Sequence, residues 1–223
     1  MLEIKVEEKV NPKIVKEVIC EMCRNFYDLG WVSGTGGGVS IKKGNTIFMA
    51  PSGVEKEKIR PEDIFELNEK GEITTLPENS ALKLTECAPL FLSAFELRGA
   101  GAVLHSHSIH VVLATMLASR VEGFLSTLEF TELEMIKGLK GFGYYDTFIL
   151  PVIDNTAKEC DLTDQLREAI LAYPDTCAVA VRNHGIYVWG KDEKQAKTQA
   201  ECLDYLCEIK LKMKAYGIDH PSR

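Results

Sequence analysis

The sequence predicts an α/β protein in which a hairpin-rich sheet is flanked by helices, and three patterns lead to this prediction. Two short apolar runs, residues 39–41 and 46–49, surround the turn Lys43-Gly44-Asn45, as expected for a β-hairpin. Other short apolar runs are typical of buried strands. Longer segments place apolar residues every three or four positions, the spacing of an amphipathic helix. We see no repeat or linker, so residues 1–223 are expected to form a single domain.

Residues 11–83 are expected to form one helix and several short strands. Asn11 before Pro12 is typical of a helix start, and apolar residues then recur at helical spacing until Gly30 ends the helix. The further elements predicted here are a glycine-rich turn at 31–38, the hairpin, a loop at 51–61, and short strands at 64–67 and 72–74.

Residues 85–217 are expected to alternate between helices and apolar strands. The last helix, 192–216, keeps apolar residues at helical spacing and ends at Gly217, so we interpret it as a helix that covers the core. The stretch between 118 and 147 is predicted to be irregular. The remaining predicted elements are helices at 85–98, 109–117 and 162–171, and strands at 102–105, 148–152, 177–181 and 186–189.

Composition and charge narrow the classes of function. Apolar residues make up 45% of the chain and charged residues 26%, as in ordinary soluble globular proteins. The net charge of -7, with no local cluster of lysine or arginine, argues against a nucleic-acid partner. No apolar run approaches the roughly 20 residues of a membrane span. Residues 1–5 lack the apolar core of a signal peptide, so we expect a cytoplasmic protein with no membrane partner.

The seven cysteines are odd in number and irregularly spaced, which does not suggest a disulfide framework. Cys20 and Cys23 have the spacing of a redox or zinc pair, but they lie inside a helical pattern and no second pair accompanies them. Cys202 and Cys207 likewise fall in the last helix. Buried structural thiols are the interpretation that we favour for all four.

Three histidines stand at the ends of predicted strands. His105 and His107 follow an apolar run, and their side chains are expected to point the same way because side chains alternate along a strand. His184 follows a second apolar run, 177–181. Surface histidines at strand ends are the alternative interpretation for an isolated pair. The third histidine favours a site for a borderline metal such as zinc.

Two turns rich in small residues lie on either side of the predicted hairpin. The glycine-rich turn joins a helix to a strand, the reverse of the context of a nucleotide-binding loop. Glycine-dense backbone can still direct several N–H groups toward an anion, and the turn that ends at Gly53 could bind the same anion. Lys56 follows the second turn, and its side chain either assists in binding the anion or faces solvent. From composition alone, simple tight turns are the favoured interpretation.

Together these residues resemble the class II aldolase/adducin family, whose enzymes use zinc-bound phospho-sugars, and more specifically its dehydratase branch. The motifs that carry the resemblance are GWVSGTGGG at 30–38, APSGV at 50–54, CAPLF at 87–91, HSHS at 105–108, EMIKG at 134–138 and HGIYVWG at 184–190. The resemblance implies a three-layer α/β/α fold around a mainly antiparallel sheet. It also implies a cyclic homotetramer with active sites between subunits, and a phosphorylated methylthio-sugar as substrate.

The resemblance further implies a role for individual residues. His105, His107 and His184 correspond to the zinc ligands, Glu134 to the acid/base, and Cys87 to a cysteine that contacts substrate. The phosphate is expected on the two turns, and the residues predicted to bind it are Gly36, Gly37, Ser52 and Gly53.

Glu86 introduces an alternative, because it aligns with the metal-approaching glutamate of the sugar-phosphate aldolases. A zinc-dependent aldolase or epimerase that uses Glu86 is therefore the second hypothesis. The third is a non-catalytic adaptor of the same fold. Adaptors of this kind tend to lose the metal histidines, and this chain keeps all three.

Overall fold

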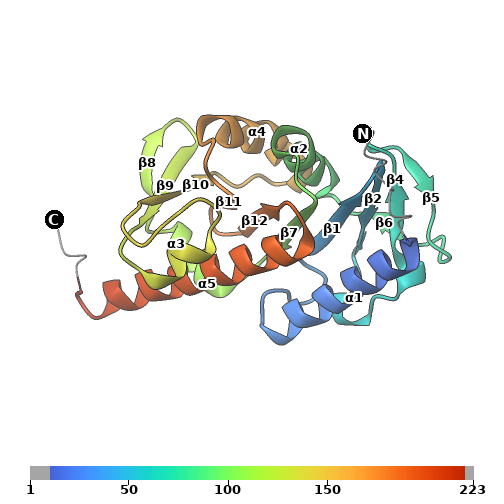
Figure 1. Ribbon diagram of the computed structural model, residues 1–223, viewed down its shortest axis with the longest axis horizontal. Helices are drawn as coiled ribbons and strands as arrows, with labels where there is room; N and C mark the ends of the chain where they lie inside the picture. The colour runs from blue at the N-terminus through green and yellow to red at the C-terminus, as the bar shows by residue number, and fades with distance from the viewer. Residues whose placement is uncertain (1–10, 219–223) are drawn as a thin grey trace, which may run out of the picture.

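A ten-stranded sheet forms the centre of the computed structural model, which describes residues 11–218 (Figure 1). The strands lie in the order β5-β4-β2-β1-β7-β12-β11-β10-β9-β8, and all neighbours pair antiparallel except β10 and β11. The sheet is therefore mainly antiparallel, as expected. Its strands are β1 (Gly38–Lys43), β2 (Thr46–Met49), β4 (Phe65–Leu67), β5 (Ile73–Thr75), β7 (Ala102–Ser106), β8 (Ser119–Glu122), β9 (Leu125–Phe130), β10 (Phe148–Ile153), β11 (Ala178–Val181) and β12 (Gly185–Gly190). A separate small sheet pairs β3 (Pro51–Ser52) with β6 (Lys83–Leu84).

Helices cover both faces of the sheet and complete three layers (Figure 1). Buried residues of α1, α3 and α5 pack in a core on one face, and those of α2 and α4 pack in a second core on the other. The α-helices are α1 (Pro12–Asp28), α2 (Ala88–Arg98), α3 (Ile109–Thr115), α4 (Thr163–Ala172) and α5 (Glu193–Ala215). The 3₁₀ helices are η1 (Lys56–Lys58), η2 (Pro61–Asp63), η3 (Glu134–Gly138) and η4 (Glu159–Leu162). Between residues 11 and 218, no helix has the length and apolar character needed to cross a membrane.

Side chains cap the two long helices where the sequence predicts that they begin. The Asn11 side chain accepts a hydrogen bond from the backbone N–H of Lys13 at 3.1 Å, and Pro12 occupies the first turn. At α5, Asp192 accepts one from the N–H of Gln195 at 2.8 Å. The first N–H groups of a helix have no partner within it, so these caps favour a helix start at these positions.

The alternation of side chains along β7 decides which face of the sheet carries the histidines. Ala102 and Leu104 pack in the core with α1 and α5, whereas Val103 packs with α2 and α4. His105, two residues after Val103, therefore points to the α2 side, where the ring of Tyr187 stacks on it at a centroid distance of 4.1 Å.

The stretch predicted to be irregular contains a hairpin at the edge of the sheet. β8 and β9 pair with each other around Gly123, which has a φ of 51°, and β9 also pairs with β10. All residues of β8 are exposed, and polar residues interrupt β9, so neither strand shows a clear apolar run. The prediction was wrong because backbone pairing, rather than a buried face, holds β8 at the edge.

Candidate metal centre and active site

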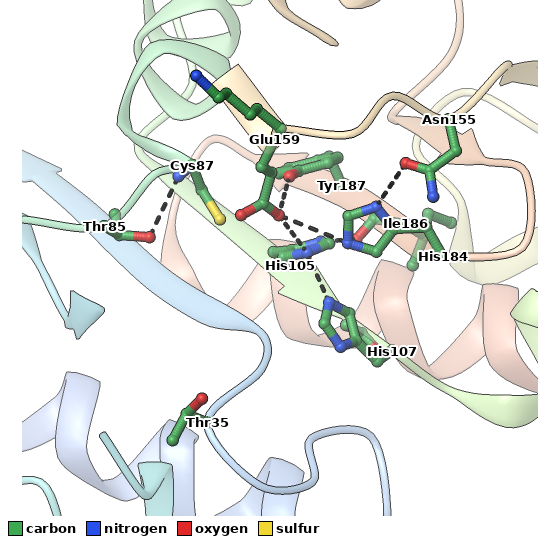
Figure 2. A network of polar contacts seen from close by, with 12 residues as sticks. Thr35, Thr85, Cys87, His105, His107, Asn155, Glu159, His184, Ile186 and Tyr187 are labelled. Atoms are coloured by element: carbon green, nitrogen blue, oxygen red, sulfur yellow. Dashed lines mark hydrogen bonds and ion pairs between the residues drawn. The ribbon is translucent and has the colours of Figure 1, made fainter. Parts of the chain in front are cut away.

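Antiparallel pairing of β7 with β12 brings the three histidines together (Figure 2). His105 pairs with Tyr187, so the end of β7 lies beside the start of β12. His107 follows β7 in the chain, and His184 directly precedes β12. The three ring centroids are 4.7, 4.9 and 5.1 Å apart. The rings therefore meet at one end of the sheet.

Hydrogen bonds at the outer ring nitrogens direct the inner nitrogens toward one another. Nδ1 of His105 donates to the carbonyl oxygen of Ile186 at 3.1 Å, and Nδ1 of His184 donates to Oδ1 of Asn155 at 3.2 Å. These bonds occupy Nδ1 and leave Nε2 of each ring facing the cluster, where it binds a metal once it is unprotonated. Nε2 of His105 lies 2.9 Å from Nε2 of His107. Two ring nitrogens at that distance need a proton or a cation between them.

Glu159, at the start of η4, is a fourth group of this cluster and was not predicted from the sequence. Its Oε1 lies 2.9 Å from Nε2 of His105 and 3.6 Å from Nε2 of His184. One donor atom from Glu159 and one from each histidine lie within 4.8 Å of one another. Zinc–ligand bonds of about 2.0–2.1 Å place tetrahedral ligands about 3.3 Å apart, so the donor atoms fit a zinc ion.

Tyr187 and Cys87 lie next to the Glu159 carboxylate. The buried Tyr187 hydroxyl donates to Oε1 at 2.7 Å, and the Cys87 thiol, at the N-cap of α2, lies beside the Glu159 carboxylate (Figure 2). Burial by itself would raise the pKa of Glu159, but the hydrogen bond and charge of His105 outweigh burial and hold this pKa well below its usual range. The group is therefore an anion beside the histidines.

Burial also sets the protonation states of His107 and Cys87. Desolvation, followed by repulsion from the other two histidines, lowers the pKa of His107 to about 3. Its ring is therefore neutral near pH 7, the form that binds metals. Desolvation and then the negative charge of Glu159 raise the pKa of the Cys87 thiol. Cys87 is accordingly a protonated thiol at the cavity wall.

A polar cavity of about 460 Å³ opens beside the histidines. Its wall includes four of the predicted site residues outside the metal cluster, namely Gly36, Gly37, Ser52 and Cys87. Gly53 instead lines a neighbouring cavity of about 330 Å³, and Thr35 borders both. The other residues that line the larger cavity are Lys56, Thr85, Glu86, His107, Asn155, Thr156, Ala157, Glu159, Asn183 and His184.

The glycine-rich turn is packed directly against the histidines. A Cβ at Gly36 would lie 2.5 Å from Nδ1 of His107. Gly37 has a φ of 70°, which favours glycine, and a Cβ there would lie 2.9 Å from the carbonyl oxygen of His105. A side chain at Gly36 would therefore displace the His107 ring, and one at Gly37 would collide with Val32 and the His105 backbone.

We expect Gly36→Ala to weaken metal binding by roughly tenfold or more, as the loss of a group that supports a metal ligand does. The added methyl group must push the His107 ring from its position. Titration with a competing chelator measures the affinity, and Ser33→Ala, an exposed change in the same turn, is the matched control. Unchanged affinity in Gly36→Ala would show that the His107 ring is not a ligand in this position.

The structure places Glu134 away from this cavity. Glu134 begins η3, its side chain is 70% exposed, and its Oε1 pairs with Nζ of Lys137 at 2.9 Å. Ile136 of the same 3₁₀ helix packs in the core with α1 and α5, on the face of the sheet opposite the one to which His105 points. Within one copy, Glu134 is therefore not brought together with the other predicted site residues. Glu86 lines the cavity, although among the described residues it is not part of the histidine cluster.

Glu159→Gln is expected to lower the affinity for zinc by about 10- to 100-fold, because the neutral amide removes an anion that adjoins three imidazoles. Chelator competition and the absorption spectrum of the cobalt-substituted protein measure this without an activity assay. Asp161→Asn, an exposed acidic residue of the same 3₁₀ helix, is the control. If the two variants bind zinc equally well, Glu159 has no part in metal binding.

Comparisons with known proteins agree with this fold. A family model described as the Class II Aldolase and Adducin N-terminal domain matches residues 17–211. A Gallus gallus protein named methylthioribulose-1-phosphate dehydratase is 47% identical over 227 residues, which cover 97% of this chain and 90% of that protein. A Homo sapiens protein of the same name is 47% identical over 221 residues, which cover 96% of this chain and 88% of that protein. The solved structure of an L-fuculose 1-phosphate aldolase superposes with a TM-score of 0.74 at 19% identity, over 92% of this chain and 88% of that one.

Proposed function

The chain belongs to the class II aldolase and adducin family, and on this premise we propose that it is a methylthioribulose-1-phosphate dehydratase of methionine salvage. In that reaction, 5-methylthioribulose 1-phosphate loses water and becomes 2,3-diketo-5-methylthiopentyl 1-phosphate. The observation that carries the proposal is 47% identity to a curated dehydratase over 97% of this chain. A polar cavity between histidines and glycine turns supports it, because a sugar phosphate offers hydroxyls at one end and an anion at the other.

His105, His107 and His184 would hold one zinc ion per chain. Their Nε2 atoms converge, and Glu159 places an anionic oxygen at the same point. The chemistry that zinc supplies at such a site is polarisation of the oxygens on C2 and C3 of the substrate, which acidifies the proton on C3. Hydrogen bonds from His105 to Ile186 and from His184 to Asn155 would keep both rings oriented during this step.

Glu134 would move the proton from C3 to the leaving C4 hydroxyl, and a neighbouring copy of the chain would contribute this residue. It does not line the cavity of its own chain, and its exposed side chain pairs with Lys137 instead. A positioned carboxylic acid can perform this proton transfer. The proposal therefore includes the cyclic homotetramer, with each cavity placed between two copies. It also includes a cytoplasmic location, in keeping with seven free cysteines.

The two turns would bind the phosphate of the substrate. Gly36, Gly37 and Ser52 line the main cavity and would offer backbone N–H groups and a hydroxyl, and Gly53 would contribute from the adjoining cavity. Cys87, a buried thiol on the same wall, would contact the sugar between the phosphate and the metal.

Product analysis after incubation of the zinc-loaded protein with 5-methylthioribulose 1-phosphate tests the function. A dehydratase yields the diketone with its carbon chain intact, whereas an aldolase releases a smaller carbonyl fragment. Release of such a fragment would favour the second candidate, an aldolase that uses Glu86, which lines the cavity. If neither product formed with zinc bound, the adaptor hypothesis would be favoured.

A further inference from the structure

Lys56 is a buried cation at the cavity wall and does not face solvent. The residue is 2% exposed and lines the cavity together with Gly36, Gly37 and Ser52. None of the ion pairs found between residues 11 and 218 includes it. Lysine is rarely buried to this extent without an anionic partner, because removal of an ammonium group from water is costly. The position therefore needs a functional explanation.

The ammonium group connects the two turns that border the cavity. Nζ donates to the carbonyl oxygen of Thr35 in the glycine-rich turn at 2.8 Å, and to that of Val54 after the second turn at 3.2 Å. An ammonium group has three N–H donors, and these two bonds to neutral carbonyls leave one available and the charge uncompensated. Both turns are thus held to a single positive charge.

The cationic and acidic side chains of the cavity wall come from different elements of the fold. Lys56 is the one lysine or arginine among the residues that line it, and it lies with the small residues of the two turns. The acidic lining residues, Glu86 and Glu159, lie on elements near the histidines and the N-terminus of α2. A substrate with one anionic end would therefore be oriented with that end at Lys56 and its uncharged oxygens at the histidines.

We propose that Lys56 is the cation that recognises the substrate phosphate, and that it holds the two turns together as one phosphate cradle. This inference rests on the proposed function, in which the substrate is phosphorylated. An ammonium group acts on a phosphate as a compact point charge, and hydrogen bonds of this kind are stronger than those between neutral groups.

Inorganic phosphate is the probe, with binding to the zinc-loaded protein measured by calorimetry. Lys56→Gln should weaken phosphate binding by about 10- to 100-fold, since its amide can still donate to a carbonyl but carries no charge. The KM for the sugar phosphate should rise with it, with a smaller change in kcat and no loss of zinc. Lys58→Gln is the matched control, because Lys58 lies on the same 3₁₀ helix with its side chain 66% exposed and paired with Glu55.

Phosphate binding by Lys56→Gln at the affinity of the parent protein, with zinc retained, would overturn the inference and leave Lys56 as a structural tie. If Lys56→Gln fails to fold, a crystal structure of the parent protein with zinc and phosphate decides instead. A phosphate oxygen in hydrogen-bond contact with Nζ of Lys56 supports the inference, and phosphate bound elsewhere refutes it. Failure of the proposed function would look different, because phosphate would bind through Lys56 while no diketone formed.

Discussion

Glu134→Gln is expected to retain zinc and substrate but to lose about 100- to 10,000-fold in kcat, the usual contribution of a positioned acid/base group. The amide has nearly the volume of the carboxylic acid but cannot transfer a proton. The side chain is largely exposed, so the substitution should leave the fold intact. Diketone formation and metal content give kcat, KM and zinc occupancy. Near-normal turnover, with Glu86→Gln inactive instead, would assign the acid/base role to Glu86 at the cavity wall.

Mixed oligomers would show which copy supplies Glu134. Co-expression of Glu134→Gln chains with His105→Ala/His107→Ala chains should restore about one quarter of the parent activity. Half of the cavities then keep their histidines, and half of those face a neighbour with Glu134. Each variant expressed alone should stay inactive. If mixing restores no activity although mixed oligomers form, Glu134 does not act across a subunit boundary.

The His105→Ala/His107→Ala double variant is expected to lose stoichiometric zinc and all measurable turnover. The change removes two of the four converging donor atoms and leaves His184 and Glu159, too few for a structural or catalytic zinc site. Metal analysis after dialysis measures the loss, and circular dichroism verifies the fold.

His110→Ala is the matched control for this double variant. His110 lies on α3, its side chain is 40% exposed, and its Nδ1 pairs with Asp204 at 3.1 Å, outside the metal cluster. This variant should keep its zinc. Full zinc in a folded double variant would place the metal site elsewhere in the protein.

Local patterns in the sequence were sufficient for much of the scaffold. The caps at Asn11 and Asp192 and the hairpin around Gly44 depend on neighbouring residues, and the structure has all three. The four cysteines in the helical patterns are buried as expected, namely Cys20, Cys23, Cys202 and Cys207. The edge strand β8 was missed because every one of its side chains is exposed, so its pairing with β9 leaves no apolar pattern in the sequence.

The sequence by itself placed three histidines at strand ends, because an apolar run and the alternation after it are local properties. Only the tertiary structure decided what surrounds them. Glu159 reaches His105 from a 3₁₀ helix that carries no distinguishing motif. Lys56 is buried next to two turns, and its ammonium group donates hydrogen bonds to the carbonyl oxygens of Thr35 and Val54. Glu134, within a specific motif, is exposed and does not line the cavity of its own chain. Strand order and sheet face depend on packing between distant segments, and no residue's immediate neighbours encode that packing.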